Sequence, residues 1–273
     1  MSIFYNTRTG KSGCRLITLM LLLLPVSLWP AQDNQLPQAV KQDAIKLVLI
    51  LDDIGNNADA GMRAVNLPGQ VTYAVLPFTP HGKMLAQAAH NAGKEVMLHA
   101  PMSNLSGMAL GDGGLTLTQT EDVFTDTLRR ALADIPHIRG LNNHTGSELT
   151  AAYQPMSWVM QELKKHDLYF VDSLTTRESV AMSAAEQFQV PSLKRHVFLD
   201  NVQQAEAIDV EFKRALVLAQ QQGYAVAIGH PYPETLRYLE SALPALAKMN
   251  IELVPPSAMI EQLKAASLSP DQP

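Results

Sequence analysis

Cysteine, aromatic residues and charged residues are all scarce in this sequence. Its 273 residues include one cysteine, and only 6% of them are aromatic and 17% charged. A single cysteine excludes a disulfide-rich miniprotein, and a chain of this length buries enough surface to fold without a disulfide or a structural metal. Because 47% of the residues are hydrophobic, the chain is neither collagen-like nor intrinsically disordered. The composition therefore predicts a globular protein.

Runs of basic residues are also missing. Lysine and arginine number 21 against 26 aspartates and glutamates, which gives a net charge of -5. A surface that binds nucleic acid needs clustered positive charge to neutralise the phosphates. We therefore expect no nucleic-acid partner.

One longer apolar run lies near the N-terminus, at residues 16–29. Arg8, Lys11 and Arg15 precede it, and the polar segment AQDNQ follows it. This order is typical of a secretory signal. The apolar run has 14 residues, fewer than the ~20 that span a bilayer comfortably. We expect residues 1–31 to be a signal peptide that sends the protein to the periplasm or out of the cell. Only an uncleaved signal would hold the chain at a membrane.

After a polar, proline-containing segment at 32–46, which we interpret as a linker, the pattern changes. Short apolar runs recur about every 29 residues, roughly the length of one βα unit. They predict eight strands, at 47–51, 71–76, 95–98, 138–143, 168–171, 196–199, 224–228 and 251–254. Segments of helical length lie at 81–91, 120–134, 155–166, 204–222 and 233–249. We expect one α/β domain over 47–265, followed by a polar tail at 266–273.

The predicted strands are apolar throughout instead of alternating, so both faces of their sheet should be buried, as in parallel α/β folds. Five of the eight strand ends carry a carboxylate or an imidazole, namely Asp52 and Asp53, His99, His144, Asp172, and His230. Ends of strands that are distant in the sequence converge easily only when the sheet closes on itself. The pattern therefore favours a barrel over an open sheet.

These side chains suit metal-assisted hydrolysis. Two imidazoles and one carboxylate leave positions open for water and substrate, as catalytic zinc requires, although the same set suits iron(II). A second carboxylate could accept a proton from the water, and a further histidine could protonate the leaving group. Neighbouring strand residues point to opposite faces, so Asp52 and Asp53 should differ in role unless the strand end bends. The sequence predicts a divalent metal, with zinc the first choice.

The segments around these residues, ILDD, EVMLHAPM, GLNNHTGS, YFVDS and AIGHP, resemble the polysaccharide deacetylase family, and more closely its divergent branch in bacterial envelopes. The resemblance covers about residues 46–263. It implies a distorted (β/α) barrel of about seven parallel strands in a single domain. It also implies a divalent metal, usually zinc, and removal of acetyl groups from an extracellular glycan, such as one derived from peptidoglycan.

The resemblance also implies a role for several side chains. Asp52 corresponds to the catalytic base and Asp53 to a metal ligand, because the family's paired aspartates follow its first strand. His99 corresponds to the leading metal histidine, and His230 to the histidine that protonates the leaving group.

The chain departs from the typical family pattern in two places. Typical members have another histidine four residues after the first, where this chain has Ser103, and GLNNH replaces their arginine-proline motif. His144 most simply restores the missing ligand, because it directly follows an apolar run as His99 does. A rival assignment pairs His144 with Glu148, but Glu148 lies on a predicted loop. We therefore expect His99 and His144 to bind the metal together with the aspartate.

Three further residues are assigned to supporting or substrate-binding roles: Asp172, Asn143 and Ser147. Asp172 would orient a metal-binding histidine or cap a turn, and Asn142 and Asn143 would line the pocket or satisfy backbone groups. The loop at 103–116 is either a rim over the site or a plain surface excursion. Five more histidines are expected to be solvated or to serve packing, namely His81, His90, His137, His166 and His196.

These observations support three functional hypotheses. The first is an exported, metal-dependent carbohydrate deacetylase. The second is a catalytically inactive glycan-binding or envelope-assembly protein that keeps the metal pocket, and it predicts metal and sugar binding without release of acetate. The third, a phosphoesterase or related hydrolase, would be expected to have more histidines near the first strand and a second metal site.

Overall fold

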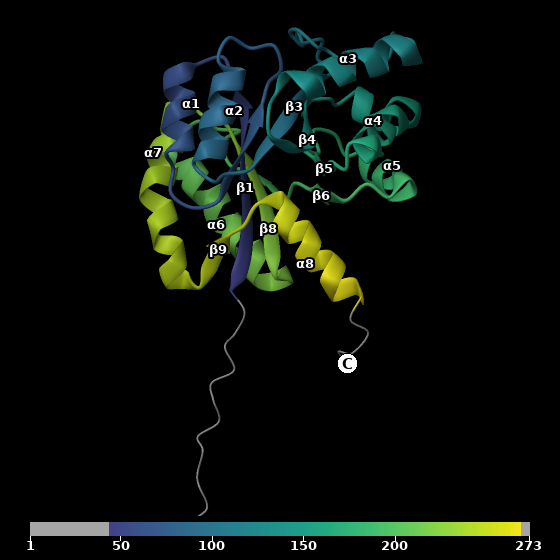
Figure 1. Ribbon diagram of the computed structural model, residues 1–273. Coiled ribbons are helices and arrows are strands. Elements are labelled where there is room, and N and C mark those ends of the chain that lie inside the picture. Colours follow the sequence, from purple (N-terminus) through teal and green to yellow (C-terminus); the bar gives the residue numbers. More distant parts are fainter. Residues whose placement is uncertain (1–43, 269–273) are drawn as a thin grey trace, which may run out of the picture. The chain divides into compact units, whose positions relative to one another are not determined.

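The described part of the chain is built on one parallel sheet of nine strands (Figure 1). The computed structural model describes residues 44–268. The predicted signal peptide, nearly all of the predicted linker and residues 269–273 lie outside this range. The strands are β1 (Ile45–Ile54), β2 (Val71–Val75), β3 (Val96–Met102), β4 (Ile138–Thr145), β5 (Tyr169–Asp172), β6 (Ser192–Lys194), β7 (Val197–Phe198), β8 (Tyr224–Gly229) and β9 (Ile251–Leu253).

Helices cover the outer face of this sheet, with α1, α2 and α7 grouped on one side and α3, α4 and α5 on the other (Figure 1). The α-helices are α1 (Ala58–Val65), α2 (Gly82–Asn91), α3 (Glu121–Asp134), α4 (Tyr153–Lys165), α5 (Ala181–Phe188), α6 (Ala205–Gln222), α7 (Pro233–Ala242) and α8 (Pro256–Leu268). Two 3-10 helices are η1 (Leu149–Ala151) and η2 (Leu243–Met249).

The sheet curls into a distorted barrel, which confirms the predicted fold class. Its strand order is β6-β5-β4-β3-β2-β1-β8-β7, and β9 pairs with β1. The two edge strands follow each other in the chain, and Arg195 and His196 join them. Arg195 N donates to Asp172 O on the β5 side, whereas His196 N donates to Val226 O on the β8 side. Arg195 and His196 therefore connect the two edge strands of the sheet, β6 and β7.

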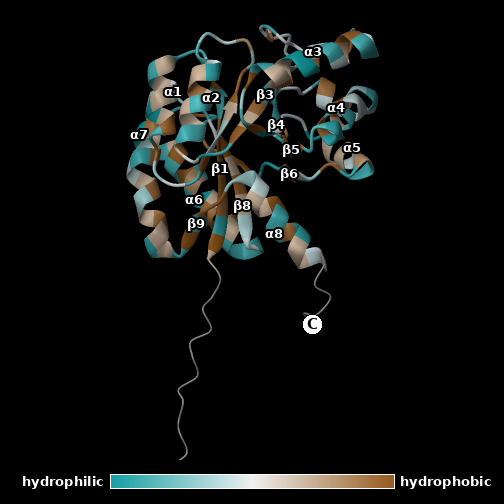
Figure 2. Ribbon diagram, in the orientation of Figure 1, coloured by the Kyte–Doolittle hydropathy of each residue, from teal (hydrophilic) through white to brown (hydrophobic). Residues whose placement is uncertain are grey.

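The strands are largely hydrophobic (Figure 2). As their continuous apolar sequences predict, most residues are buried on both faces in β1, β2, β3, β5 and β8. In β1, Leu47, Leu49 and Leu51 belong to the large core between the sheet and the helices. Val48 and Ile50 belong to a smaller core inside the barrel. Alternate residues of one strand thus fill two separate cores.

The inner core explains where the polar side chains lie. Inward-facing rows run through Ile50, Met97, Val171 and Ile228. Because strand side chains repeat every two residues, the next inward positions along these rows are Asp52, His99, Ser173 and His230. At the opposite end, Met259 of α8 belongs to the same inner core. The barrel therefore has an apolar floor and a polar mouth at the carboxyl ends of its strands.

Several elements differ from the sequence prediction. The predicted helix at 233–249 divides into α7 and η2, because Pro244 has no N–H to continue the α-helical hydrogen bonds. Strand β6 and helices α1, α5 and α8 were not predicted. β1 begins at Ile45, inside the predicted linker, and α8 continues to Leu268, inside the predicted tail.

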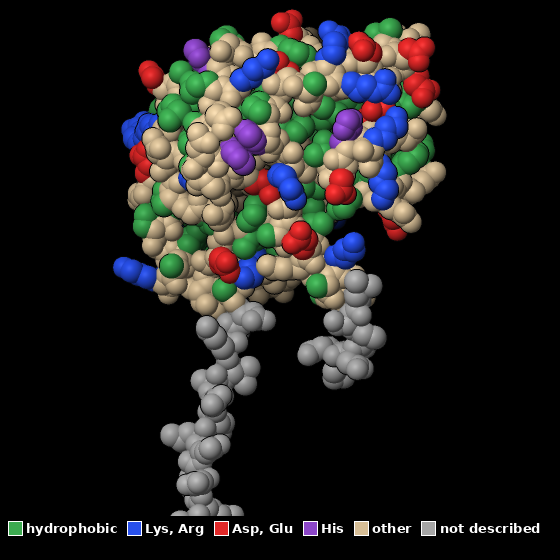
Figure 3. Space-filling model, in the orientation of Figure 1, with side chains coloured by type: hydrophobic (Ala, Val, Ile, Leu, Met, Phe, Trp, Pro, Cys, Tyr) green, Lys and Arg blue, Asp and Glu red, His purple; other side chains and the backbone are tan. Residues whose placement is uncertain are grey.

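Two further features concern charge and hydropathy. On the face in Figure 3, acidic and basic side chains are interspersed. Between residues 44 and 268, none of the helices is both long enough and apolar enough to cross a membrane.

Candidate active site

The carboxyl ends of the strands surround a pocket of about 370 Å³. Its lining includes the five residues predicted to carry the chemistry, namely Asp52, Asp53, His99, His144 and His230. Asn143, which was assigned to the same site, also lines the pocket. The structure thus brings side chains from β1, β3, β4 and the end of β8 into one place.

A bend at the end of β1 allows two consecutive aspartates to reach the same pocket. Asp53 has a φ of 58°, and the pairing with β2 shifts between Leu51 and Ile54. Leu51 pairs with Tyr73 and Ile54 with Val75, so three steps on β1 correspond to two on β2. Such a bulge re-aims a side chain. It therefore provides the bend without which the two aspartates would face opposite sides.

Asp53, His99 and His144 form a compact set of possible metal ligands, with ligand atoms all within 4.8 Å of one another. Asp53 Oδ1 lies 2.9 Å from His144 Nδ1 and 3.2 Å from His99 Nε2. Although this oxygen is buried, it accepts no hydrogen bond from the described residues. Two imidazoles and one carboxylate fit a single zinc or iron(II) ion and leave coordination positions open. The residues present therefore fit the predicted divalent metal.

The charges in this set favour an ionised aspartate. Burial alone would raise the pKa of Asp53, but the nearby imidazoles of His144 and His99 outweigh it and lower that pKa strongly. Burial would likewise lower the pKa of His99, but the carboxylates of Asp52 and Asp53 raise it overall. Imidazoles and carboxylates therefore attract each other within this set, and the same carboxylates would attract a cation.

Asp52 lies next to the possible metal ligands, within the same pocket. Its Oδ2 lies 3.7 Å from His99 Nε2, and its Oδ1 accepts a hydrogen bond of 2.8 Å from Asn142 Nδ2. The side chain is buried, and this burial raises its pKa even though His99, His230 and Asn142 act in the opposite direction. A carboxylate whose pKa is raised toward neutrality is a more effective general base.

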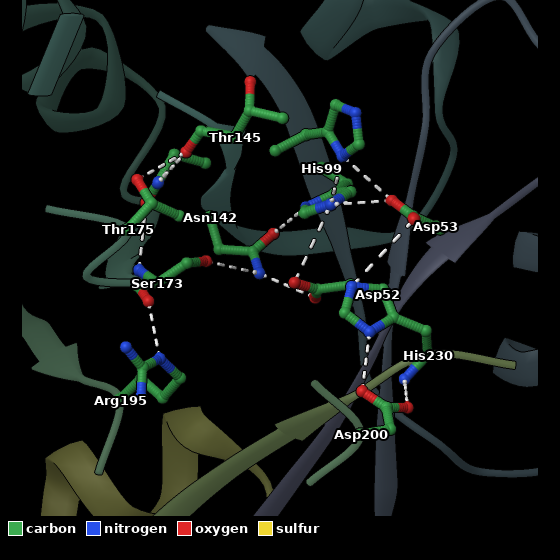
Figure 4. A network of polar contacts seen from close by, with 12 residues as sticks. Asp52, Asp53, His99, Asn142, Thr145, Ser173, Thr175, Arg195, Asp200 and His230 are labelled. Carbon is green, nitrogen blue, oxygen red and sulfur yellow. Dashed lines mark hydrogen bonds and ion pairs between the residues drawn. The ribbon is translucent and has the colours of Figure 1, made fainter. Parts of the chain in front are cut away.

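His230 is held by Asp200, which follows β7 (Figure 4). His230 Nδ1 lies 2.8 Å from Asp200 Oδ1, and the His230 backbone N–H donates to Asp200 Oδ2 at 2.6 Å. Burial would lower the pKa of His230, but Asp200, with smaller contributions from Asp52 and Asp53, raises it to about 9. Its Nε2 lies 3.9 Å from Asp53 Oδ2, on the pocket side. A protonated imidazole in this place can act as a general acid.

The sequence interpretation missed Asp200, although a signal was present. Asp200 comes directly after the apolar run predicted as a strand at 196–199, as Asp52 does after the first run. Thr235 Oγ1 donates to Asp200 Oδ2 at 2.8 Å, so the carboxylate is fixed from two sides. Asp200 is therefore the carboxylate that orients His230.

The remaining assigned residues serve mainly the backbone around the pocket. Asp172 Oδ1 accepts from Leu174 N and its Oδ2 from Ser179 Oγ, so its contacts favour the turn-capping alternative. Ser147 Oγ accepts a hydrogen bond from Leu105 N, which connects it to the loop at 103–116. Asn143 Oδ1 accepts from the backbone N–H of Ser173, in addition to lining the pocket.

The rim of the pocket is partly apolar. Met108 and Ala109 line it, so the loop at 103–116 is a rim of the site. Phe198 and Tyr232 also line it, and their rings lie 6.3 Å and 5.2 Å from the His230 ring between centroids. Two aromatic faces therefore flank the proposed acid.

Comparisons with known proteins agree with this fold. Residues 49–260 match the family model described as divergent polysaccharide deacetylase. The chain is 37% identical to the uncharacterized protein YibQ of Escherichia coli over 225 residues, which are 82% of this chain and 70% of that protein. It is 34% identical to an uncharacterized protein of Haemophilus influenzae over 209 residues, 77% of this chain and 74% of that protein.

A crystal structure of an uncharacterized protein from Agrobacterium tumefaciens C58 has the same fold. It superposes with a TM-score of 0.77 at 21% identity and covers 80% of this chain and 90% of that one. The family match spans β1 to α8 and includes every residue of the pocket described above. The chain belongs to the divergent polysaccharide deacetylase family.

Proposed function

We propose that this protein is an exported, metal-dependent hydrolase that removes acetyl groups from a carbohydrate of the bacterial envelope. The observation that carries the proposal is the convergence of Asp53, His99 and His144 beside two further groups suited to proton transfer. Asp52 and His230 reach the same pocket from different strands. Family membership supports a carbohydrate substrate.

Asp53, His99 and His144 would hold the divalent metal, with zinc as the first choice. When bound, such an ion polarises the acetyl carbonyl and makes water more acidic. Asp52, whose carboxylate lies beside the ligand atoms, would accept the proton of the attacking water. His230, protonated through Asp200, would donate a proton to the departing nitrogen or oxygen. The proposed base, Asp52 on β1, and the proposed acid, His230 after β8, therefore reach the pocket from separate strands.

The location of the protein is part of this proposal. The basic residues, apolar run and polar segment at the N-terminus are typical of a secretory signal, and envelope glycans lie outside the cytoplasm. We therefore place the protein in the periplasm or outside the cell. A peptidoglycan-derived fragment is a reasonable first substrate to test, because the sequence resembles a branch found in bacterial envelopes.

The experiment that tests the proposal is release of acetate from acetylated peptidoglycan fragments by the zinc-loaded full-length chain. Wild type should release acetate, whereas Asp52→Asn and His230→Ala should each lose about 10²–10⁴-fold, the usual contribution of general acid–base catalysis. His166→Ala is the matched histidine control, because His166 is an exposed residue at the end of α4.

Two results would contradict the proposal, the first its deacetylase activity and the second its proton-transfer roles. Wild type that binds metal and sugar but releases no acetate from N- or O-acetylated glycans would instead support the inactive glycan-binding alternative. Acetate release that survives both Asp52→Asn and His230→Ala would mean that these side chains do not transfer the protons.

A further inference from the structure

Asn142 occupies the centre of the polar layer at the mouth of the barrel. It lies on β4 directly opposite His99 of β3, and it is fully buried. Its amide touches three side chains from three other strands or strand ends, namely His99, Asp52 and Ser173 (Figure 4). Neither the chemistry proposed above nor the sequence prediction gives this residue a part in the reaction.

The contacts of Asn142 fix the direction of its amide. The nitrogen, Nδ2, donates to Asp52 Oδ1 at 2.8 Å and to Ser173 Oγ at 3.4 Å. The oxygen, Oδ1, lies 2.7 Å from His99 Nδ1. Reversing the amide would place its N–H₂ against His99 and its oxygen against a carboxylate. The observed orientation is therefore the one that satisfies the Asp52 carboxylate.

This orientation has a consequence for His99. A carbonyl oxygen can only accept a hydrogen bond, so His99 Nδ1 must carry the hydrogen. When the ring is neutral, its lone pair is then on Nε2. That nitrogen lies 3.2 Å from Asp53 Oδ1 and 3.1 Å from His144 Nδ1, at the candidate metal site. A partner on the far nitrogen of a metal-binding histidine typically fixes its tautomer and ring orientation in this way.

The same amide also positions Asp52. Its N–H holds Oδ1, which leaves Oδ2 as the oxygen nearer to His99 Nε2, at 3.7 Å. One neutral side chain therefore links a metal ligand and the neighbouring carboxylate through opposite ends of its amide.

We infer that Asn142 is a positioning residue with two separable tasks. Its oxygen selects the His99 tautomer that binds metal, and its N–H₂ orients Asp52 for proton transfer. The second task rests on the function proposed above, whereas the first requires only that His99 be a ligand.

Two variants separate the tasks. Asn142→Asp keeps an oxygen that accepts from His99 Nδ1 but replaces the N–H donor by an oxygen that faces Asp52. Asn142→Leu removes both the acceptor and the donor while keeping a side chain of similar size. Thr72→Val is the control, because Thr72 is buried in β2 and its hydroxyl has no hydrogen-bond partner among the described residues.

The first measurement is the ¹⁵N NMR spectrum of the metal-free full-length chain, labelled at histidine, at alkaline pH where the ring is neutral. We expect His99 to be protonated at Nδ1 in wild type, Asn142→Asp and Thr72→Val, and to become a mixture of tautomers in Asn142→Leu. The His99 signals are identified from their loss in His99→Gln. A wild-type ring protonated at Nε2, or an unchanged tautomer in Asn142→Leu, would overturn the first task.

The second measurement is affinity for Zn²⁺, followed by acetate release. Loss of a partner of a metal-binding histidine typically weakens metal affinity by about 10–100-fold, which we expect for Asn142→Leu. Asn142→Asp should bind Zn²⁺ at least as tightly as wild type and yet release far less acetate. Full acetate release by Asn142→Asp would overturn the second task. If wild type released no acetate at all, the proposed function would fail, while the tautomer and affinity results would still decide the first task.

Discussion

The stability of the metal-free protein is expected to depend on pH through His230. Its pKa is about 9 in the folded protein and about 6.5 for an ordinary histidine. Between these values the folded chain holds a proton that the unfolded chain does not, so the free energy of unfolding falls as pH rises. The contribution is fully present below about pH 6.5 and is lost as pH rises through about 9.

The expected size follows from the contacts of His230. Its side chain is 23% exposed and paired with the almost fully buried Asp200, so screening by solvent is limited. A difference of about 2.5 pH units corresponds to about 3 kcal/mol at 1.36 kcal/mol per unit. His230→Gln removes this titration but keeps an amide that can donate to Asp200. The wild type should therefore lose about 3 kcal/mol more than His230→Gln over this pH range.

Urea unfolding in EDTA between about pH 6 and pH 10 measures this difference, because the transition midpoint and slope give the free energy at each pH. His166→Gln serves as the control and should follow the wild type. Equal losses of stability in wild type and His230→Gln would refute the reasoning, because they would mean that Asp200 does not hold a proton on His230.

Three further substitutions test parts of the fold and site. Asp172→Asn should cost about 1–3 kcal/mol in urea unfolding, because one of the two groups held by its carboxylate loses its acceptor, and zinc stoichiometry should not change. Met259→Ala should cost about 2–5 kcal/mol, since it opens a cavity in the inner core at the floor of the barrel; a loss below 1 kcal/mol would contradict that packing. In Gly229→Ala, the new Cβ would lie 3.3 Å from Asp200 Oδ2 and displace this carboxylate. Because Asp200 raises the pKa of His230, NMR titration should then show a lower pKa for His230. An unchanged pKa would contradict this.

Much of the barrel was predictable because its strands are continuous apolar runs. Strand β1, with five consecutive fully buried residues from Leu47 to Leu51, is readable from hydrophobicity alone. Strand β6 was missed because three residues, one of them exposed Lys194, carry no such signal. Helix α1, with eight residues, is likewise too short for a clear helical repeat.

The site was predictable where a polar residue ends an apolar run, as at His99. Asp200 follows the same rule and could have been found by applying it to the sixth run. The contacts of Asn142 with His99 and Asp52 could not be predicted from the sequence, because they depend on the cross-strand pairing that places Asn142 opposite His99. The direction of Asp53 depends on a bulge, and the apolar pattern of β1 does not reveal where the strand bends.

Equilibrium dialysis with Zn²⁺ tests the central claim most directly. Asp53, His99 and His144 are taken to form one metal site, so the wild-type chain should bind one zinc ion per chain. Asp53→Ala and His144→Ala should each lose this ion, while His166→Ala should retain it. Absence of zinc binding by the wild type, or stoichiometric binding by both Asp53→Ala and His144→Ala, would contradict the account.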